Sequence, residues 1–400
     1  MWQRLVVSDY TPKEELLRRI DGLKENMGEA GIDFAVIMQN ADLFYFSGTI
    51  QKGVMVIPVD HDPFLFVERS LERVKVETPL DITPIRKDKE IKDVLQQKGI
   101  LKGKGGMEMD VVPVSVFERF KKTTGFENFV DIAPLIRELR IIKSPFELEQ
   151  VKGSGRIISR IFEKAKDIIR EGVRELDIDA ELVAEGRRHG HQGFLRMRGL
   201  NQEMMNLYVT AGGTSGVPSN MDVPISGLGL TAAVAQGSSL KPVERGVPVL
   251  VDYGGGYNGY VTDETRTYVV GEMKERFRKP YEVTREIVED TAGFGCEGID
   301  CTEIFNRAYE IVKKAHLQDH FMGFGEGQVS FVGHGLGLEI DELPVITPRH
   351  NRLLREGMVF AFEPKFVFPG EGSVGIEVDF IARKNGLERV MDFPIDVVYV

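Results

Sequence analysis

The sequence lacks several features that would assign it to a common class at once. It contains two cysteines, Cys296 and Cys301, in 400 residues, which is too few for the disulfide framework of a small secreted domain. We expect both to be reduced thiols. No apolar run approaches the roughly 20 residues that cross a bilayer, and the first residues, MWQRLVVSDY, lack the basic, apolar and small-residue order of a secretory signal. These absences predict a cytoplasmic protein with no membrane partner.

Clusters of positive charge are also missing. The formal net charge is −11 at pH 7, and basic stretches such as RFRK at 276–279 are short. Proteins that bind nucleic acid contact phosphates through clustered lysines and arginines, so no nucleic-acid partner is expected. With 42% hydrophobic and 28% charged residues, the composition is that of an ordinary globular protein.

The length predicts two domains, because 400 residues exceed the size of one compact core. The boundary is predicted in the segment IIKSPFELEQVK, where Ser144 can cap a helix, Pro145 suits its first turn and Glu147 completes a capping box. We therefore predict one domain over residues 1–143 and a second over residues 144–400, which begins with a long helix.

The first domain alternates between helical and β-type patterns, which predicts a small α/β domain. The expected helices span residues 11–30, 91–98 and 114–122, and the expected strands span residues 33–38, 43–48, 53–59, 63–68 and 107–112.

The second domain contains an internal echo. REGVRELDIDAELVAEGRR follows a helix predicted over residues 145–169, and CEGIDCTEIFNRAYEIVKK follows a helix predicted over residues 274–291. Both segments pair Glu-Gly with an acidic helix start and lead into β-type sequence. The pattern indicates two helix–helix–sheet halves around a pseudo-two-fold axis, although helix hairpins with Gly and Asp in the turn are common and this signal is weak alone.

A pair of carboxylates lies in the segment VPVLVDYGGGYNGYVTDETRTYVV, residues 247–270. Its Asn258-Gly259 dipeptide predicts a hairpin turn, which brings Asp252 and Asp263 roughly opposite each other on neighbouring strands. Desolvating one unpaired carboxylate is costly, and two that face each other cost more unless a cation lies between them. Surface aspartates beside a turn are the plainer alternative, but Asp252 directly follows the apolar run VPVLV.

Three further candidate metal ligands follow along the chain. His334 lies in FVGHGLGL, where the flanking glycines let the backbone pass close to another segment and leave the imidazole unobstructed. Glu363 ends the β-type run MVFAFEP, and Glu377 lies within SVGIEVDFIA on the face opposite its apolar neighbours. Each alone is more often a paired or edge residue than a ligand. Together, four carboxylates and one imidazole are typical of a site for two divalent ions such as Mn, Co, Fe or Zn.

These motifs resemble those of a known family. The segments VDYG, GYVTDETRT, GHGLGL, DELP, EGMVFAFEP and GIEVDFIA are similar to the successive signatures of the creatinase/prolidase/methionine aminopeptidase superfamily, the "pita-bread" dinuclear metallohydrolases. The N-terminal part and the segment RIIKSPFELEQV resemble the prolidase (Xaa-Pro dipeptidase) branch, so the resemblance covers essentially the whole chain. It implies a creatinase-like N-terminal α/β domain, a pita-bread C-terminal domain and a homodimer.

The resemblance also implies a role for each ligand. Asp252 would chelate one ion, Asp263 and Glu377 would bridge both ions, and His334 and Glu363 would complete the shell of the other ion. Mn or Co is the expected metal, with Zn and Fe as alternatives.

The implied chemistry is hydrolysis. Two ions about 3.5–4 Å apart hold a bridging water and lower its pKa from about 15.7 towards ~7, and the same ions polarise the scissile carbonyl. Glu363 is implied as the proton shuttle, which makes Glu363 and His334 the catalytic candidates. Thr265 is expected to orient a ligand carboxylate.

The sequence departs from the family pattern where the family contacts its substrate. Prolidase-like peptidases carry two further histidines there, and the matching positions are Gln236, in TAAVAQGSS, and Asp341, in DELP. Gly375 stands where the family has an arginine, and Val378 where it has a second acid. The Gly/Ser-rich segment 212–230 is longer than usual, and we interpret it as a substrate-facing loop or, alternatively, as a flexible surface insertion.

The leading prediction is a metal-dependent hydrolase of the Xaa-Pro dipeptidase or aminopeptidase type, which cleaves a peptide or amide C–N bond in a small substrate. Gln236 and Asp341 are its substrate-binding candidates, and an acid at position 341 would repel a substrate carboxylate and accept an amine or hydroxyl. One alternative is an enzyme of the same fold that acts on a non-peptide small molecule. Another is a catalytically silent binding homologue, against which the intact ligand set argues.

Overall fold

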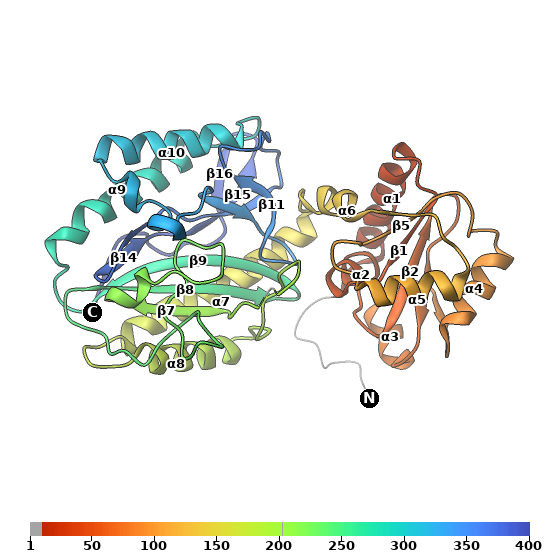
Figure 1. Cartoon of the computed structure of the whole chain (residues 1–400), viewed down its shortest axis with the longest axis horizontal. Helices are drawn as coiled ribbons and strands as arrows, with labels where there is room; N and C mark the ends of the chain where they lie inside the picture. Colours follow the sequence, from red (N-terminus) through yellow and green to blue (C-terminus); the bar gives the residue numbers. More distant parts are fainter. Residues whose placement is uncertain (1–9, 202) are drawn as a thin grey trace. The chain divides into compact units, whose positions relative to one another are not determined.

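The computed structural model describes residues 10–201 and 203–400, and the chain divides into two compact units (Figure 1). The first unit comprises the chain up to Arg140 and a short segment that begins at Arg198. The second comprises Ile141–Met197 and Glu203–Val400. The division falls after Arg140, whereas the sequence predicts a boundary after residue 143. No helix in the described part of the chain combines the length and apolarity needed to span a bilayer.

The first unit is built on a six-stranded mixed sheet with the strand order β4-β3-β2-β1-β5-β6. Its strands are β1 (Phe34–Ile37), β2 (Gly53–Pro58), β3 (Phe64–Val67), β4 (Ile82–Pro84), β5 (Gly105–Met107) and β6 (Phe129–Asp131). Its helices are α1 (Lys13–Glu29), α2 (Asn40–Ser47), α3 (Leu71–Glu77), α4 (Asp88–Gln97), α5 (Val114–Thr124) and α6 (Ala133–Arg140). Strand β1 is central in this sheet, because it pairs with β2 on one side and β5 on the other, and it is buried along its whole length.

Helix α2 differs from the sequence prediction, which places a strand over residues 43–48. The Gln39 side chain accepts a hydrogen bond from the Asp42 backbone N–H at the start of the helix, and Gly48 ends it in the left-handed region with φ 75°. Most of the helix is buried, so its apolar residues show no one-sided helical periodicity. A fully buried helix and a buried strand cannot be told apart by such a pattern. The strand predicted over residues 107–112 is also wrong in extent, because β5 ends at Met107.

The second unit repeats one arrangement, a pair of helices packed on a sheet. The first pair is α7 (Pro145–Ile168) and α8 (Glu175–Arg188), and the second pair is α9 (Glu275–Phe294) and α10 (Cys301–Ala315). One sheet has the order β17-β9-β8-β7, another has the order β11-β10-β12-β15-β16, and β13 and β14 form a two-stranded ladder. The strands are β7 (Leu207–Ala211), β8 (Pro248–Tyr257), β9 (Tyr260–Val269), β10 (Gly333–Gly335), β11 (Glu342–Ile346), β12 (Val359–Phe362), β13 (Lys365–Phe368), β14 (Gly372–Gly375), β15 (Val378–Arg383), β16 (Gly386–Arg389) and β17 (Val398–Tyr399).

Each helix pair packs through its own apolar core, so the two halves expected from the sequence echo are present. Helices α7 and α8 lie along β7, β8 and β9, whereas α9 lies beside β13, β14 and β16, and α10 packs against α9 and β11 (Figure 1). Ile158 and Phe162 of α7 share a core with Val251 of β8 and Tyr268 of β9. Residues of α9 and α10 share a larger core with Phe360, Phe380 and other residues of the second sheet.

The start of α7 confirms the predicted capping box. The Ser144 hydroxyl accepts a hydrogen bond from Glu147 N at 3.2 Å, and the Glu147 carboxylate accepts one from Ser144 N at 2.9 Å. The same carboxylate accepts a hydrogen bond from the Tyr260 hydroxyl at 3.0 Å. The cap therefore also joins the start of α7 to the start of strand β9.

Candidate metal centre

The hairpin of β8 and β9 places two candidate ligands on one face of the first sheet. Asn258 and Gly259 have φ values of 49° and 89°, as the predicted two-residue turn requires. The register pairs Asp252 with Thr265 and Gly254 with Asp263. Asp252 and Asp263 are thus diagonal neighbours on the same face, two residues apart in register, rather than directly opposite each other.

His334 lies at the centre of β10, between β11 and β12. A Cβ atom at Gly333 would lie 2.4 Å from the carbonyl oxygen of Ala361, and one at Gly335 would lie 2.1 Å from that of Leu343. Only glycine fits at both positions. This confirms the prediction that the backbone beside His334 passes close to other segments.

Glu377 lies in a break between β14 and β15, so the strand predicted over SVGIEVDFIA is interrupted at the candidate ligand. Instead of pairing within its own sheet, Glu377 is bound by β9. Its backbone N–H donates to Thr265 O at 3.1 Å, and its carbonyl accepts from Arg266 Nη1 at 2.7 Å. The Thr265 hydroxyl also donates to Glu377 Oε2 at 2.8 Å. Glu363 directly follows β12, at the end of its apolar run.

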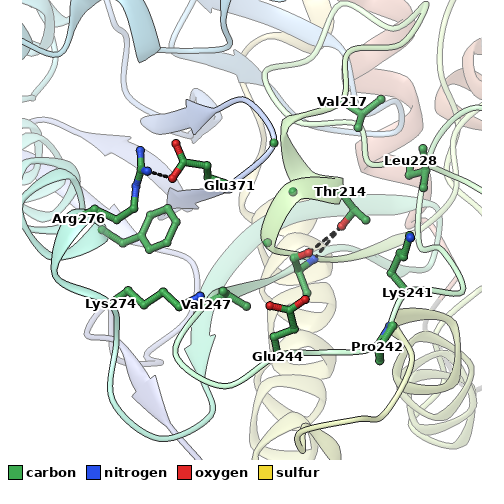
Figure 2. A pocket seen from close by; sticks show the side chains of 15 residues that line it. Thr214, Val217, Leu228, Lys241, Pro242, Glu244, Val247, Lys274, Arg276 and Glu371 are labelled. Atoms are coloured by element: carbon green, nitrogen blue, oxygen red, sulfur yellow. Dashed lines mark hydrogen bonds and ion pairs between the residues drawn. The ribbon is translucent and has the colours of Figure 1, made fainter.

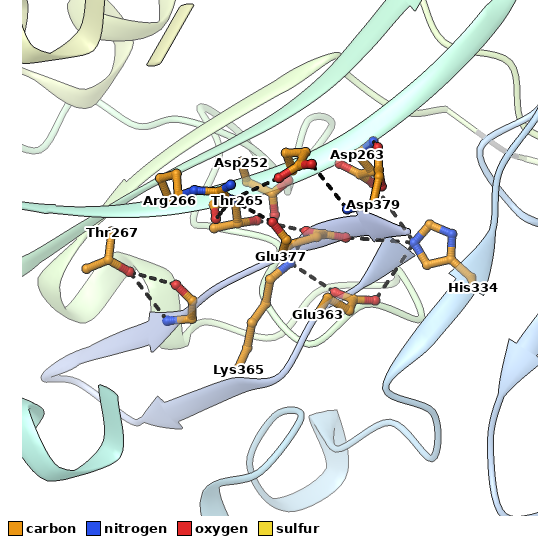
Figure 3. A network of polar contacts seen from close by, with 12 residues as sticks. Asp252, Asp263, Thr265, Arg266, Thr267, His334, Glu363, Lys365, Glu377 and Asp379 are labelled. Carbon is orange, nitrogen blue, oxygen red and sulfur yellow. Dashed lines mark hydrogen bonds and ion pairs between the residues drawn. The ribbon is translucent and has the colours of Figure 1, made fainter. Parts of the chain in front are cut away.

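These residues converge at the place where the two sheets meet (Figure 3). His334 Nε2 lies 3.9 Å from Asp263 Oδ2, 3.9 Å from Glu363 Oε1 and 4.0 Å from Glu377 Oε1. The separations are too long for hydrogen bonds but fit two ligand atoms that each bind a common ion at about 2.0–2.2 Å. Asp263, His334 and Glu377 form the one group of three potential ligands that the described residues bring within 4.8 Å of one another.

Lys365 contributes a buried positive charge that the sequence analysis missed. Its side chain is 3% exposed, and Nζ donates to Asp252 Oδ2 at 3.1 Å, Glu363 Oε2 at 2.9 Å and Glu377 Oε2 at 2.8 Å. The alternation of FEPKFVF places Lys365 two residues after Glu363 and on the same face. A lysine within an apolar run next to a candidate ligand was the available signal.

The electrostatics of the cluster show a surplus of negative charge. Burial raises the pKa of Asp263 well above its ordinary value, and the charges of Glu377 and Asp252 raise it further. Burial likewise raises the pKa of Asp252, which the Lys365 ammonium opposes. Burial would lower the pKa of Lys365, but the carboxylates of Asp252, Glu363 and Glu377 hold it well above its ordinary value. A cation bound among these groups would remove the repulsion.

Asp379 and Tyr208 are two further residues that sequence reasoning missed. Asp379 is fully buried, and its Oδ2 accepts a hydrogen bond from Asp263 N at 2.9 Å. It lies one residue beyond Val378, the position at which the resemblance led us to expect a second acid. Tyr208 lies opposite Asp252 in the pairing of β7 with β8. Burial and then the charges of Asp252 and Asp263 raise the pKa of its hydroxyl.

The substrate-binding candidates are Gln236 and Asp341. Gln236 Oε1 accepts a hydrogen bond from the Tyr208 hydroxyl at 2.6 Å, and Gln236 Nε2 donates to Glu203 O at 2.8 Å. Gln236 is therefore held by a residue of β7 that lies opposite Asp252 in the strand pairing. Asp341 lies in the turn that connects β10 to β11, close in sequence to His334.

Glu342 holds that turn in place. Its Oε1 accepts hydrogen bonds from Leu338 N at 2.8 Å and Glu339 N at 3.1 Å, and its Oε2 forms a buried ion pair with Lys143 Nζ at 3.2 Å. Of the carboxylates that follow His334 in the sequence, Glu342 thus has a structural role in this turn.

A separate cavity of about 510 Å³ lies in the second unit (Figure 2). Its wall combines Lys241, Lys274 and Arg276 with Glu244 and Glu371, and Arg276 forms an ion pair with Glu371. Residues 212–214, part of the predicted substrate-facing loop, also line it, but none of the predicted site residues does. The contact of this loop with substrate stays a prediction.

Comparison with known proteins places both parts of the chain. Residues 149–384 match the metallopeptidase family M24, and residues 19–142 match the creatinase/prolidase N-terminal domain. The Xaa-Pro dipeptidase of Pyrococcus furiosus is 30% identical over 374 residues, which cover 93% of this chain and 97% of the relative. The structure of the Xaa-Pro dipeptidase from Bacillus anthracis has a TM-score of 0.83 at 25% identity and covers 96% of this chain and 100% of that one. The structure of the prolidase from Pyrococcus horikoshii OT3 has a TM-score of 0.80 at 26% identity, with 95% and 100% covered.

Fold and matches together define a metallopeptidase with a creatinase-type N-terminal domain and a pita-bread C-terminal domain. This confirms the α/β fold class and the enzyme class predicted from the sequence. The chain belongs to metallopeptidase family M24. Membership implies a requirement for divalent metal ions, whereas the role of each site residue stays a prediction.

Proposed function

We propose that this chain hydrolyses the peptide bond that precedes proline in short Xaa-Pro peptides, with a divalent cation held by Asp263, His334 and Glu377. The observation that carries the proposal is the convergence of these three side chains, whose ligand atoms lie within 4.8 Å of one another in a buried site. The relatives named Xaa-Pro dipeptidase, which cover nearly the whole chain, support the substrate class.

The donor set fits such an ion. Two carboxylates and one imidazole are ligands that Mn, Co, Fe and Zn accept. Burial first, and then the charges of Glu377 and Asp252, raise the pKa of Asp263, and a bound cation would offset both effects. When bound, a divalent ion supplies a water that ionises near neutral pH and a Lewis acid for the scissile carbonyl. Mn or Co as the metal and a homodimeric state stay predictions from the resemblance, and the cytoplasmic location stays a prediction from the composition.

Glu363 is placed to move the proton. Its Oε1 faces His334 at 3.9 Å, while its Oε2 accepts a hydrogen bond from Lys365 at 2.9 Å. The ammonium therefore fixes one oxygen and leaves the other on the side of the proposed ion. In that position Oε1 can accept a proton from the attacking water and return it to the leaving nitrogen, as a general base and then a general acid.

The test is a dipeptidase assay of the Mn- or Co-loaded full chain, with Xaa-Pro dipeptides and the matched Xaa-Ala dipeptides as controls. We expect preferential turnover of the proline substrates, and a loss of about 10²–10⁴-fold in kcat for Glu363→Gln, because a positioned proton carrier contributes that much. Metal-loaded protein that turns over neither dipeptide would contradict the proposal.

A second candidate is hydrolysis of a small non-peptide amide, and two residues favour it. Gln236 is held by the Tyr208 hydroxyl, and Asp341 lies in the turn beyond His334, so an amide and an acid stand where dipeptidases of this type carry histidines. A small-amide screen with the same metal-loaded protein separates the two candidates. Turnover of an amide without turnover of Xaa-Pro dipeptides would favour the second.

A further inference from the structure

Lys365 stands among the metal-binding candidates as a cation supplied by the chain itself. It is the first residue of β13, its side chain is 3% exposed, and Nζ lies 2.8–3.1 Å from oxygens of Asp252, Glu363 and Glu377. Asp252 belongs to β8 and Glu363 directly follows β12, so the ammonium joins carboxylates from two different sheets. It approaches them from a different direction than His334 does (Figure 3).

Glu363 and Glu377 each place one carboxylate oxygen near Lys365 and the other near His334. Glu363 directs Oε2 to Lys365 and Oε1 towards His334, and Glu377 does the same with its Oε2 and Oε1. A carboxylate that gives one oxygen to each of two cations is how a pair of metal ions is bridged in two-metal sites. In this site the Lys365 ammonium occupies one of the two cation positions that Glu363 and Glu377 would bridge.

Room for the ammonium is built into the backbone. Lys365 pairs with Gly375 across β13 and β14, and a Cβ atom at Gly375 would lie 2.5 Å from Lys365 Cγ and 3.2 Å from its Cβ. Any side chain at position 375 would displace the lysine stem. The absence of a side chain at Gly375 therefore leaves the space through which the lysine stem reaches the carboxylates.

A second metal ion would compete for the same atoms. An ion bound to Asp252 Oδ2 and Glu377 Oε2 must approach each oxygen to about 2.0–2.2 Å. Those oxygens already lie 3.1 Å and 2.8 Å from Lys365 Nζ, so a divalent ion there would meet a buried positive charge at close range, where repulsion is strong.

We propose that the Lys365 ammonium fills the second cation position of this site and that the chain binds one divalent ion, on the side of His334. This inference rests on the proposed function, because it assumes that Asp263, His334 and Glu377 bind metal. It differs from the two-ion expectation drawn from the sequence. An ammonium neutralises Asp252 and orients Glu363 and Glu377, but it has no vacant coordination position, so the water and the scissile carbonyl must share a single ion.

The experiment measures how many ions the full-length protein holds. Metal-free protein is saturated with Mn²⁺, freed of excess ion and analysed for manganese per chain, and electron paramagnetic resonance then distinguishes isolated from spin-coupled Mn²⁺. Wild-type protein should hold one Mn²⁺ per chain with the spectrum of an isolated ion. Lys365→Ala, which removes charge and volume, should hold two coupled ions, whereas Lys365→Arg, which keeps the charge, should hold one. Lys384→Ala removes an exposed lysine just beyond β15 and serves as the matched control, with one ion expected.

The possible outcomes distinguish the single-ion inference from the proposed function. Two coupled ions in wild-type protein would overturn this inference and leave the proposed function intact. No bound ion in wild-type protein would overturn both. One ion in a Lys365→Ala variant whose circular dichroism matches wild type would show that the ammonium does not occupy a metal position. If that variant fails to fold, the wild-type stoichiometry and spectrum still decide.

Discussion

The contact between Thr265 and Glu377 offers the sharpest test of how the site is held. The Thr265 hydroxyl donates to Glu377 Oε2 at 2.8 Å, and the two residues are 0% and 1% exposed. Thr265→Val preserves the shape of the side chain and removes the donor. A hydrogen bond to a charged group contributes about 1.5–3 kcal/mol, so the metal-free variant should lose about that much free energy of unfolding.

The second expected effect is on metal affinity. Glu377 keeps its backbone hydrogen bonds to β9 in the variant, so the residue stays in place, but its carboxylate is no longer oriented by the hydroxyl. Loss of a group that orients a metal ligand weakens binding by about 10–100-fold. We therefore expect the Mn²⁺ dissociation constant to rise by that factor.

Isothermal titration with Mn²⁺ and urea unfolding of the metal-free protein measure the two effects separately. Thr265→Ser keeps the hydroxyl and should retain most of the affinity. The reasoning is refuted if Thr265→Val binds Mn²⁺ as tightly as wild type, or if the serine variant loses as much affinity as the valine variant.

Three other predictions concern stability. Ser144→Ala removes the cap of α7 and should lower the free energy of unfolding by about 0.5–2 kcal/mol, measured by chemical denaturation against Ser144→Thr. Burial raises the pKa of Asp179 from its ordinary value of 3.8 to about 6, although the hydrogen bond from Ser238 opposes the shift. Between these two pH values the folded state binds more protons than the unfolded state. The free energy of unfolding should therefore rise as the pH falls through this window. Asp179→Asn should flatten that part of the melting-temperature profile and raise the melting temperature above pH 7, and an unchanged profile would contradict the assignment. Mn²⁺ at about 100 times its dissociation constant should stabilise the protein by about 2.7 kcal/mol, and a chelator should reverse the shift seen in calorimetry.

Local signals predicted the elements that local contacts build. The start of α7 was predictable from Ser144, Pro145 and Glu147, because all parts of a capping box lie within four residues. The Asn258-Gly259 dipeptide predicts the β8–β9 hairpin, because the turn needs positive φ at both positions. The convergence of Asp263, His334 and Glu377 was predictable as a set because each residue follows or interrupts an apolar run.

Other features depend on contacts between distant segments and escaped prediction. Residues 43–48 are apolar on all sides because α2 is buried, so burial hides the helical period. The break at Glu377 exists because β9 binds its backbone. Lys365 joins the site only because β13 and β14 pair in one register and place a glycine across from it. Such pairings cannot be obtained from the spacing of residues along one segment.

Because Lys365 pairs with Gly375 at close range, a substitution at one position affects which residues fit at the other. A side chain added at 375 collides with the stem of the lysine, and loss of the lysine leaves Asp252, Glu363 and Glu377 without the ammonium that links them. In the metal-free protein either substitution alone should therefore lower stability, while the two made together, as Lys365→Gly with Gly375→Arg, should tolerate each other. We therefore expect the residues at positions 365 and 375 to change together in related sequences.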